Sequence, residues 1–223
     1  MCISCSVLSE FEMEAAKGHS FAENGYCACG EQNPKANFVA ETGGKGYSTL
    51  AEAIANANGG TVKLVKSVVT EAMSIEANVT IDLNGERIYF KATAEKSAVL
   101  TIASGYEVMI TNGTLCTTGN NSYTTVIENN GNLTITDVIV RGTGLGGENT
   151  ATLRNNGTVS INGVSFVLAI DWNGVAIENK GDCTVNLTAT PTADARVQGV
   201  IKTVENGLTI DGKHGAIETI SIN

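Results

Sequence analysis

The sequence predicts an all-β protein folded as a right-handed parallel β-helix, a solenoid, and three observations lead to this fold class. An internal repeat recurs at a nearly constant interval. Its copies alternate apolar and polar residues, and an Asn-x-Gly corner divides three of them. Short strands of this kind cannot bury an inner face alone, whereas stacked copies form one continuous core.

The repeat is followed most easily through an apolar pair that recurs in six copies. The pairs are Val79/Ile81, Val108/Ile110, Leu133/Ile135, Val159/Ile161, Cys183/Val185 and Leu208/Ile210. Their first members are 24 to 29 residues apart, by subtraction of the residue numbers. Alternation rich in Val, Ile, Leu and Thr is typical of half-buried strands. We therefore expect parallel pairing between copies, with the second members stacked in one inward column.

Three asparagines occupy the same place in successive copies, namely Asn129, Asn155 and Asn179. Stacked copies would bring their amides into a structural ladder along the axis, hydrogen-bonded to each other and to the corner backbone. The glycine two residues later suits a sharp corner, because glycine tolerates the left-handed backbone. The last copy is a shortened one, Val204 to Ile210.

A helix over residues 48–58 is predicted to cap the first copy. Ser48 is the expected N-cap, Glu52 lies in the first turn, and Gly59 and Gly60 end the helix. A cap is needed because an open solenoid end exposes unpaired strand edges. The chain therefore divides into a Cys-rich module at residues 1–37 and a β-helix at residues 38–223.

Residues 47–54, 59–64 and 79–85 resemble the opening of pectin-lyase-like β-helix proteins, and the later Asn-x-Gly copies resemble their later coils. The resemblance covers roughly residues 38–223 and is closest to the non-catalytic type of gut Firmicutes and their phages. It implies the fold, but it does not select among lyases, hydrolases, adhesins and phage fibre or decoration proteins.

The N-terminal cysteines predict a small structural zinc site. The candidate ligands are Cys2, Cys5, His19, Cys27 and Cys29. Zinc takes four such ligands tetrahedrally, and a metal would fold a segment with so little apolar content. Residues 18–31 also resemble zinc-ribbon-like pieces, although one residue, not two, separates Cys27 from Cys29. Free thiols in a flexible tail and disulfides remain as alternatives.

Charge and hydropathy exclude several partners. The net charge of −9 disfavours nucleic acid, and no apolar run approaches the roughly 18 residues that cross a membrane. The first ten residues lack a basic stretch and an apolar stretch, so we expect no secretory signal peptide there.

Acidic residues are the candidates for carbohydrate cleavage, which in this fold uses carboxylates gathered on one face. The best placed are Asp137 with Arg141, then Asp171 and Glu178, and His214 precedes a glycine as in one hydrolase dipeptide. They do not recur at matching positions and no two aspartates are adjacent. We therefore expect a protein that is not an enzyme.

Aromatic residues are sparse, and two of them lie in polar turns. Tyr123 and Trp172 are the candidate ligand-binding residues, because exposed rings pack against sugars or partner proteins. The other interpretation is that they cover the side of the solenoid. Cys116 and Cys183 occupy apolar positions of the repeat and are expected in the core.

Two functions remain. The first is a virion surface protein of a phage, a capsid decoration or fibre component, made in the host cytosol and attached to other virion proteins by residues 1–37. Glycans are its expected ligands. By analogy with phage β-helices, which are often trimeric, a homotrimer is a possible assembly. The second is an exported adhesin domain on the bacterial cell surface.

Overall fold

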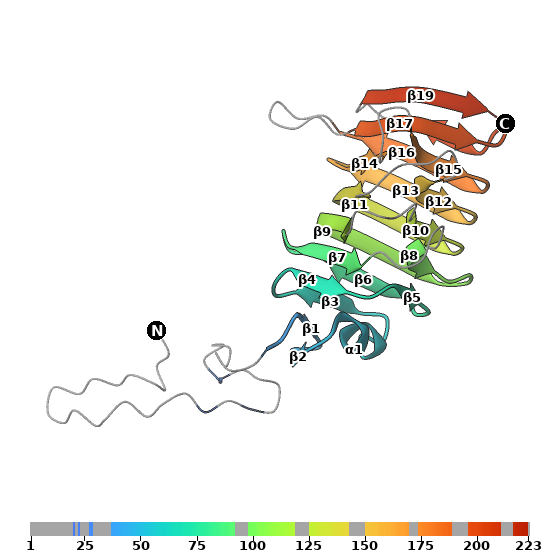
Figure 1. The fold of residues 1–223 in the computed structure, drawn as a ribbon. Helices are drawn as coiled ribbons and strands as arrows, with labels where there is room; N and C mark the ends of the chain where they lie inside the picture. The colour runs from blue at the N-terminus through green and yellow to red at the C-terminus, as the bar shows by residue number, and fades with distance from the viewer. Residues whose placement is uncertain are drawn as a thin grey trace, which may run out of the picture.

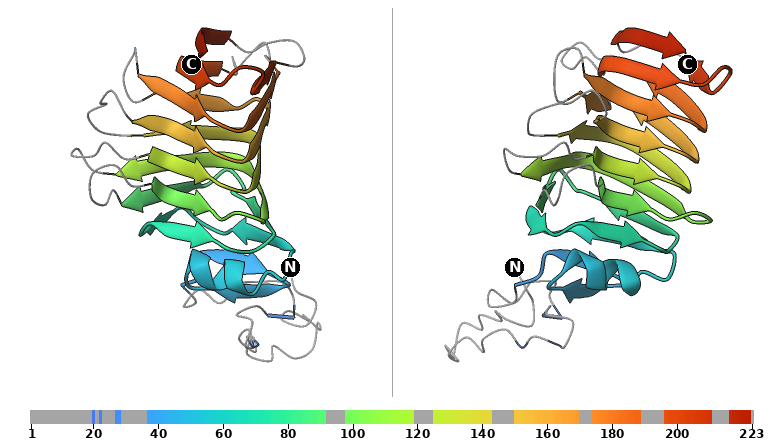
Figure 2. Two further views of the ribbon diagram at one scale, coloured as in Figure 1. Left: turned by 90° about the vertical axis from the view of Figure 1, so that its right-hand side faces the viewer. Right: turned by 45° about the vertical axis from the view of Figure 1, so that its right-hand side comes forward.

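The computed structural model describes residues 20, 22, 27–28, 37–91, 98–118, 125–142, 150–169, 174–188, 196–210 and 216–222. Over these residues the chain forms a β-solenoid (Figure 1). The strands β1 (Ala40–Thr42) and β2 (Lys45–Tyr47) and the helix α1 (Leu50–Ala55) lie at one end, and β19 (Ala216–Ile222) lies at the other. Between them the strands stack in successive layers (Figure 2).

The parallel pairings join the described strands into three ladders, and one passage through the three ladders is called a coil below. The first ladder contains β3 (Thr61–Leu64), β6 (Val79–Asp82), the first halves of β9 (Glu107–Thr118) and β11 (Asn132–Arg141), β13 (Thr158–Gly163), β16 (Asp182–Leu187) and β18 (Leu208–Ile210). The second contains β4 (Val68–Thr70), β7 (Arg87–Lys91), the second halves of β9 and β11, β14 (Phe166–Leu168) and the starts of β17 (Arg196–Thr203) and β19. The third contains β5 (Met73–Ile75), β8 (Ala98–Ile102), β10 (Thr125–Asn129), β12 (Ala151–Asn155), β15 (Val175–Asn179) and the ends of β17 and β19.

The register of the first ladder confirms the stacking of copies that the repeat predicted. The residues directly opposite one another run in the order Ile81, Ile110, Ile135, Ile161, Val185 and Ile210. The first five are at most 2% exposed, whereas Ile210 is 42% exposed. Ile210 differs because, within the described residues, β18 is paired in this ladder with β16 alone. The right-handed sense of the solenoid remains a prediction.

The N-terminal end departs from parallel pairing. There β1 pairs antiparallel with both β2 and β3, outside the repeated copies. The helix α1 is shorter than the predicted 48–58 and buries Leu50, Ala53 and Ile54 in the same core as the coils. No helix in the described ranges is long and apolar enough to cross a membrane.

The N-cap of α1 is Thr49, and the prediction of Ser48 was wrong. The backbone of Thr49 is extended (φ −131°, ψ 150°), as an N-cap requires, and its side chain accepts a hydrogen bond from Glu52 N at 3.2 Å. Ser48 instead donates its hydroxyl to Glu52 Oε2 at 3.2 Å. Both hydroxyl residues contact Glu52, but only Thr49 satisfies a backbone donor of the helix.

The corner glycines are needed for a different reason from the one expected. Gly131, Gly157 and Gly181 do not adopt positive φ. A Cβ on Gly157 would collide with Gly131 O, and one on Gly181 would collide with Gly157 O. Side chains are excluded here because successive corners stack backbone against backbone. Positive φ recurs instead at the corner between the first and second ladders, where Asn112, Asp137 and Gly163 have φ of 59°, 57° and 65°.

Candidate functional site: a charged hollow on the third ladder

The outward side of the third ladder carries a column of alternating charge. Glu128 lies opposite Arg154, and Arg154 lies opposite Glu178. Lys202 continues the column beside Glu178. These residues point outward because strand side chains alternate, and the residues on either side of each, such as Ile127 and Asn129, are buried. Parallel pairing therefore places unlike charges next to each other in every described step of the column.

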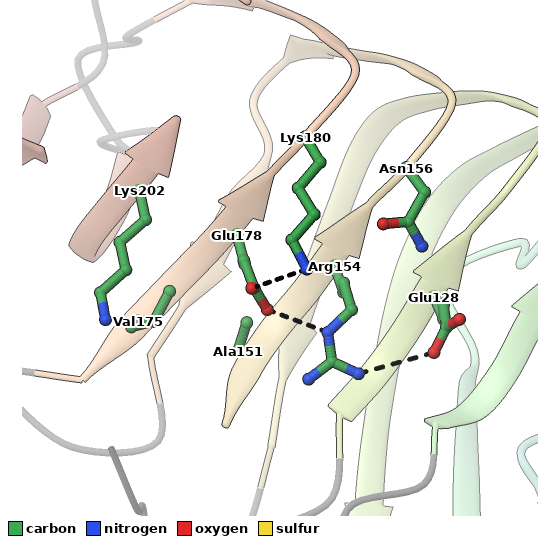
Figure 3. A pocket seen from close by; sticks show the side chains of 8 residues that line it. All are labelled: Glu128, Ala151, Arg154, Asn156, Val175, Glu178, Lys180 and Lys202. Atoms are coloured by element: carbon green, nitrogen blue, oxygen red, sulfur yellow. Dashed lines mark hydrogen bonds and ion pairs between the residues drawn. The ribbon is translucent and has the colours of Figure 1, made fainter. Parts of the chain in front are cut away.

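The column borders a hollow of about 380 Å³ (Figure 3). Besides the four charged residues, its described lining contains Ala151, Asn156, Val175 and Lys180. Ala151 and Val175 are opposite each other on β12 and β15, whereas Asn156 and Lys180 each follow directly after one of these strands. The hollow thus lies across several coils, and the backbone ladder holds its walls in register.

Ion pairs connect the column. Arg154 Nε donates to Glu178 Oε2 at 2.9 Å, and Arg154 Nη1 lies 3.6 Å from Glu128 Oε2. Lys180 Nζ lies 3.3 Å from Glu178 Oε1. The side chains of Arg154 and Glu178 are 20% and 29% exposed, so water screens this pair less than it screens a fully exposed one. One arginine therefore ties together three successive strands of the ladder, β10, β12 and β15.

Glu178 is held in its ionised form. Burial alone would raise the pKa of Glu178, but hydrogen bonds from Arg154 and Lys180, together with the charges of both cations, outweigh it. The pKa of this carboxyl is therefore below its ordinary value. A carboxylate of this kind is a poor proton donor and a weak base at neutral pH. The arrangement suits the binding of charged groups better than proton transfer.

The inner side of the same ladder carries the asparagines that the repeat brought together. Asn129 Nδ2 donates to Asn155 Oδ1 at 2.7 Å, and Asn155 Nδ2 donates to Asn179 Oδ1 at 2.7 Å. Each amide also donates to a corner carbonyl, that of Gly131, Gly157 or Gly181. All three asparagines are at most 2% exposed. The ladder satisfies buried polar groups and offers no surface to a ligand.

The last coil departs from the predicted alignment. Thr203 lies opposite Asn179 and accepts from Asn179 Nδ2 at 3.0 Å. The segment from Val204 to Gly207, which was aligned with the corner copies, forms a turn that precedes β18. Asn179 pairs with Thr203 and Cys183 pairs with Leu208, so this corner is one residue longer than the preceding one, and the sequence match was displaced.

Of the candidate catalytic residues, the structure describes Asp137, Arg141 and Glu178, and it places them at different parts of the solenoid. Asp137 lies at the corner between the first and second ladders, where its Oδ1 accepts from Val164 N at 2.7 Å. Arg141 ends β11 on the second ladder, and Glu178 lies on the third. Asp171 and His214 lie outside the described residues. Asp137 thus has a backbone-capping contact and no acidic partner among these candidates.

The remaining predicted site residues are mostly outside the described part of the chain. These are Cys2, Cys5, His19, Cys29, Tyr123 and Trp172. Cys27 is described and is buried. In the described ranges no cluster of three or more His, Cys, Asp or Glu side chains is arranged to hold a metal. Apart from Cys27, the candidate zinc ligands lie beyond those ranges.

The two repeat cysteines are buried. Cys183 lies opposite Val159 and Leu208 in the core, and burial raises the pKa of its thiol to about 12. Cys116 is 4% exposed. Burial raises the pKa of the Cys116 thiol, against the opposing charges of Arg141 and Arg87. Both thiols are protonated at neutral pH and are unsuited to nucleophilic chemistry.

The charged column was not predicted, although its signal is present in the sequence. In the three clearest copies the residue before the ladder asparagine is Glu128, Arg154 and Glu178. Alternation of sign at one repeat position becomes visible once the copies are superimposed. No protein-family model, no curated protein and no solved structure matches this chain.

Proposed function

We propose that this chain is a non-enzymatic display protein of the pectin-lyase-like β-helix type. In this proposal it is a surface component of a phage particle, a capsid decoration or a fibre part. Residues 1–37 attach it to other virion proteins, and the sides of the solenoid face glycans or the host surface. The chain acts as a rigid spacer that binds, and it performs no chemistry.

One observation carries the proposal: of the acidic candidates for catalysis, the two that the structure describes, Asp137 and Glu178, have structural partners instead. Glu178 has both carboxylate oxygens in ion pairs, and Asp137 caps a corner backbone N–H. Retaining and inverting glycosidases both need two carboxyl groups placed across a substrate bond. Asp137 and Glu178 lie on different parts of the solenoid and do not form such a pair.

The cohesion between coils supports a display role. The steps from β10 to β12 and from β12 to β15 are each joined by backbone pairing, by the asparagine ladder and by the ion pairs of the charged column. Coils joined by these three kinds of contact resist bending and separation, as a projecting spacer requires.

Location is the direct test of this proposal. Antibody to the chain, applied to purified phage particles and to bacterial cell-wall fractions from the same culture, should label the particles. Deleting residues 1–37 should remove the label from particles while the solenoid still folds. Label confined to the cell wall would instead identify an exported adhesin domain.

Catalysis is tested separately. Incubation with a panel of acidic and neutral polysaccharides should give no new reducing ends and no unsaturated products above background. Turnover that disappears in both Asp137→Asn and Glu178→Gln would overturn the non-enzymatic proposal.

A further inference from the structure

The charged hollow holds more cations than anions. Its described lining includes Arg154, Lys180 and Lys202, against the two carboxylates of Glu128 and Glu178. The chain as a whole has a net charge of −9. A local excess of positive charge on an acidic protein concentrates anions at that place.

The surplus cation is Lys202. Arg154 and Lys180 occupy the two carboxylate oxygens of Glu178, at 2.9 and 3.3 Å. Lys202 stands directly opposite Glu178 in the register, yet within the described part of the chain no ion pair of Lys202 is formed. An ammonium group has three donors and no acceptor, so Lys202 keeps its donors for a ligand.

The hollow has room beside this ammonium group. Ala151 and Val175 are short side chains, and they lie on the side of the ladder where Lys202 and Arg154 also lie (Figure 3). Its volume of about 380 Å³ exceeds that of one water, roughly 30 Å³, many times over. An anionic group of several atoms can therefore enter together with waters that complete its hydrogen bonds.

The ion pairs of the column reduce the negative charge that an entering anion would meet in the hollow. Arg154 pairs with both Glu128 and Glu178, and Lys180 pairs with Glu178, so these two cations together balance the charge of the two carboxylates. Repulsion between an entering anion and the two carboxylates is thereby reduced. Lys202, which forms no ion pair within the described column, then supplies the surplus positive charge.

We propose that this hollow is a binding site for an oxyanion, with Lys202 as its principal contact. A carboxylate and a sulfate or phosphate group share the required chemistry, namely negatively charged oxygens that accept from an ammonium group. Anion binding at this site does not depend on whether the protein is located on a phage particle or on a cell wall. The test of the site is therefore independent of the test of the proposed function.

The test is a nuclear magnetic resonance titration of the full chain with sodium sulfate and, separately, sodium acetate, at constant ionic strength. Backbone amides of β12, β15 and β17 near the hollow should shift and saturate, with a Kd on the order of millimolar. Lys202→Gln should weaken binding at least fivefold, and Lys202→Arg should retain it. Lys63→Gln is the matched control, since Lys63 is exposed on the first ladder and makes the same change in net charge.

Each outcome decides. Saturation by sulfate alone identifies a tetrahedral oxyanion, saturation by acetate alone identifies a carboxylate, and saturation by both identifies an oxyanion site of either source. Shifts that rise without saturating, or that persist unchanged in Lys202→Gln with an unaltered melting temperature, overturn the proposal. An equal loss in Lys63→Gln also overturns it, because the effect would then come from net charge.

Discussion

Asn155 and Asn156 are neighbours in the chain with opposite surroundings. Asn155 is completely buried and donates to Asn179 Oδ1, Gly157 O and Asp182 O. Asn156 is exposed and donates to Asn130 Oδ1 at 2.9 Å. The same side chain therefore has a structural role at one position and a surface role at the next.

Asn155→Ala should lower the free energy of unfolding by about 2–4 kcal/mol, because more than one buried polar group loses its partner at about 1–3 kcal/mol each. Asn156→Ala should change it by no more than about 0.5 kcal/mol. Urea unfolding followed by circular dichroism measures both. Equal losses in the two variants would mean that the ladder is not the source of the stability.

Glu178 makes stability depend on pH in a defined direction. Its pKa is lower in the folded than in the unfolded chain, so its ion pairs stabilise the fold fully above the ordinary value of 4.5 and lose that effect as pH falls through the folded-state pKa. Glu178→Gln should therefore be less stable than the parent chain at pH 7, with the difference shrinking as the pH falls below 4.5 and through the lowered folded-state pKa. Thermal unfolding of both chains across this range checks it, and a difference independent of pH would contradict the ionic origin.

Residue roles were predictable where a repeat position imposes one chemistry on all copies. Asn129, Asn155 and Asn179 are identical, so their stacking followed directly from the period. The charged column changes sign from copy to copy, so a search for identical residues at each repeat position does not detect it. Asp137 was assigned by residue type alone, because its left-handed backbone is not visible in a sequence.

Strands and helix differ in how far local sequence determines them. The strand around Ile161 follows from alternation, and its parallel partners follow from the period. The start of α1 depended on which of two adjacent hydroxyl residues has an extended backbone. Leu50, Ala53 and Ile54 pack against the core, and both hydroxyl residues before them are of types that suit an N-cap. Element identity was therefore predictable, and the exact boundary was not.

Ile161→Ala should cost about 2–5 kcal/mol of stability, the usual range for a buried aliphatic side chain cut to alanine. Ile161 is fully buried between Ile135 and Val185 in the inward column. Ser160 points to the other side of the same strand and is partly exposed, so Ser160→Ala is the control and should be near neutral. Chemical denaturation gives both values, and a loss below about 1 kcal/mol for Ile161→Ala would show that the column is loosely packed.

At the scale of the whole molecule, the chain combines a solenoid with an N-terminal segment of different composition. We expect the purified protein to contain about one zinc per chain, bound by four of Cys2, Cys5, His19, Cys27 and Cys29. Elemental analysis measures the metal. A chelator should then remove it while leaving the melting transition of the solenoid unchanged, and metal-free protein with an ordered N-terminus would refute the site.

The alternating charges also bear on how such a chain can change its length over evolutionary time. Losing the one coil that carries Arg154 would bring Glu128 directly beside Glu178, and like charges in direct opposition destabilise a sheet. Losing two adjacent coils, those of Arg154 and Glu178, would bring Glu128 beside Lys202 and preserve the alternation. Gene duplications and deletions should therefore be tolerated more readily in pairs of coils, so that descendants of this solenoid differ by even numbers of repeats.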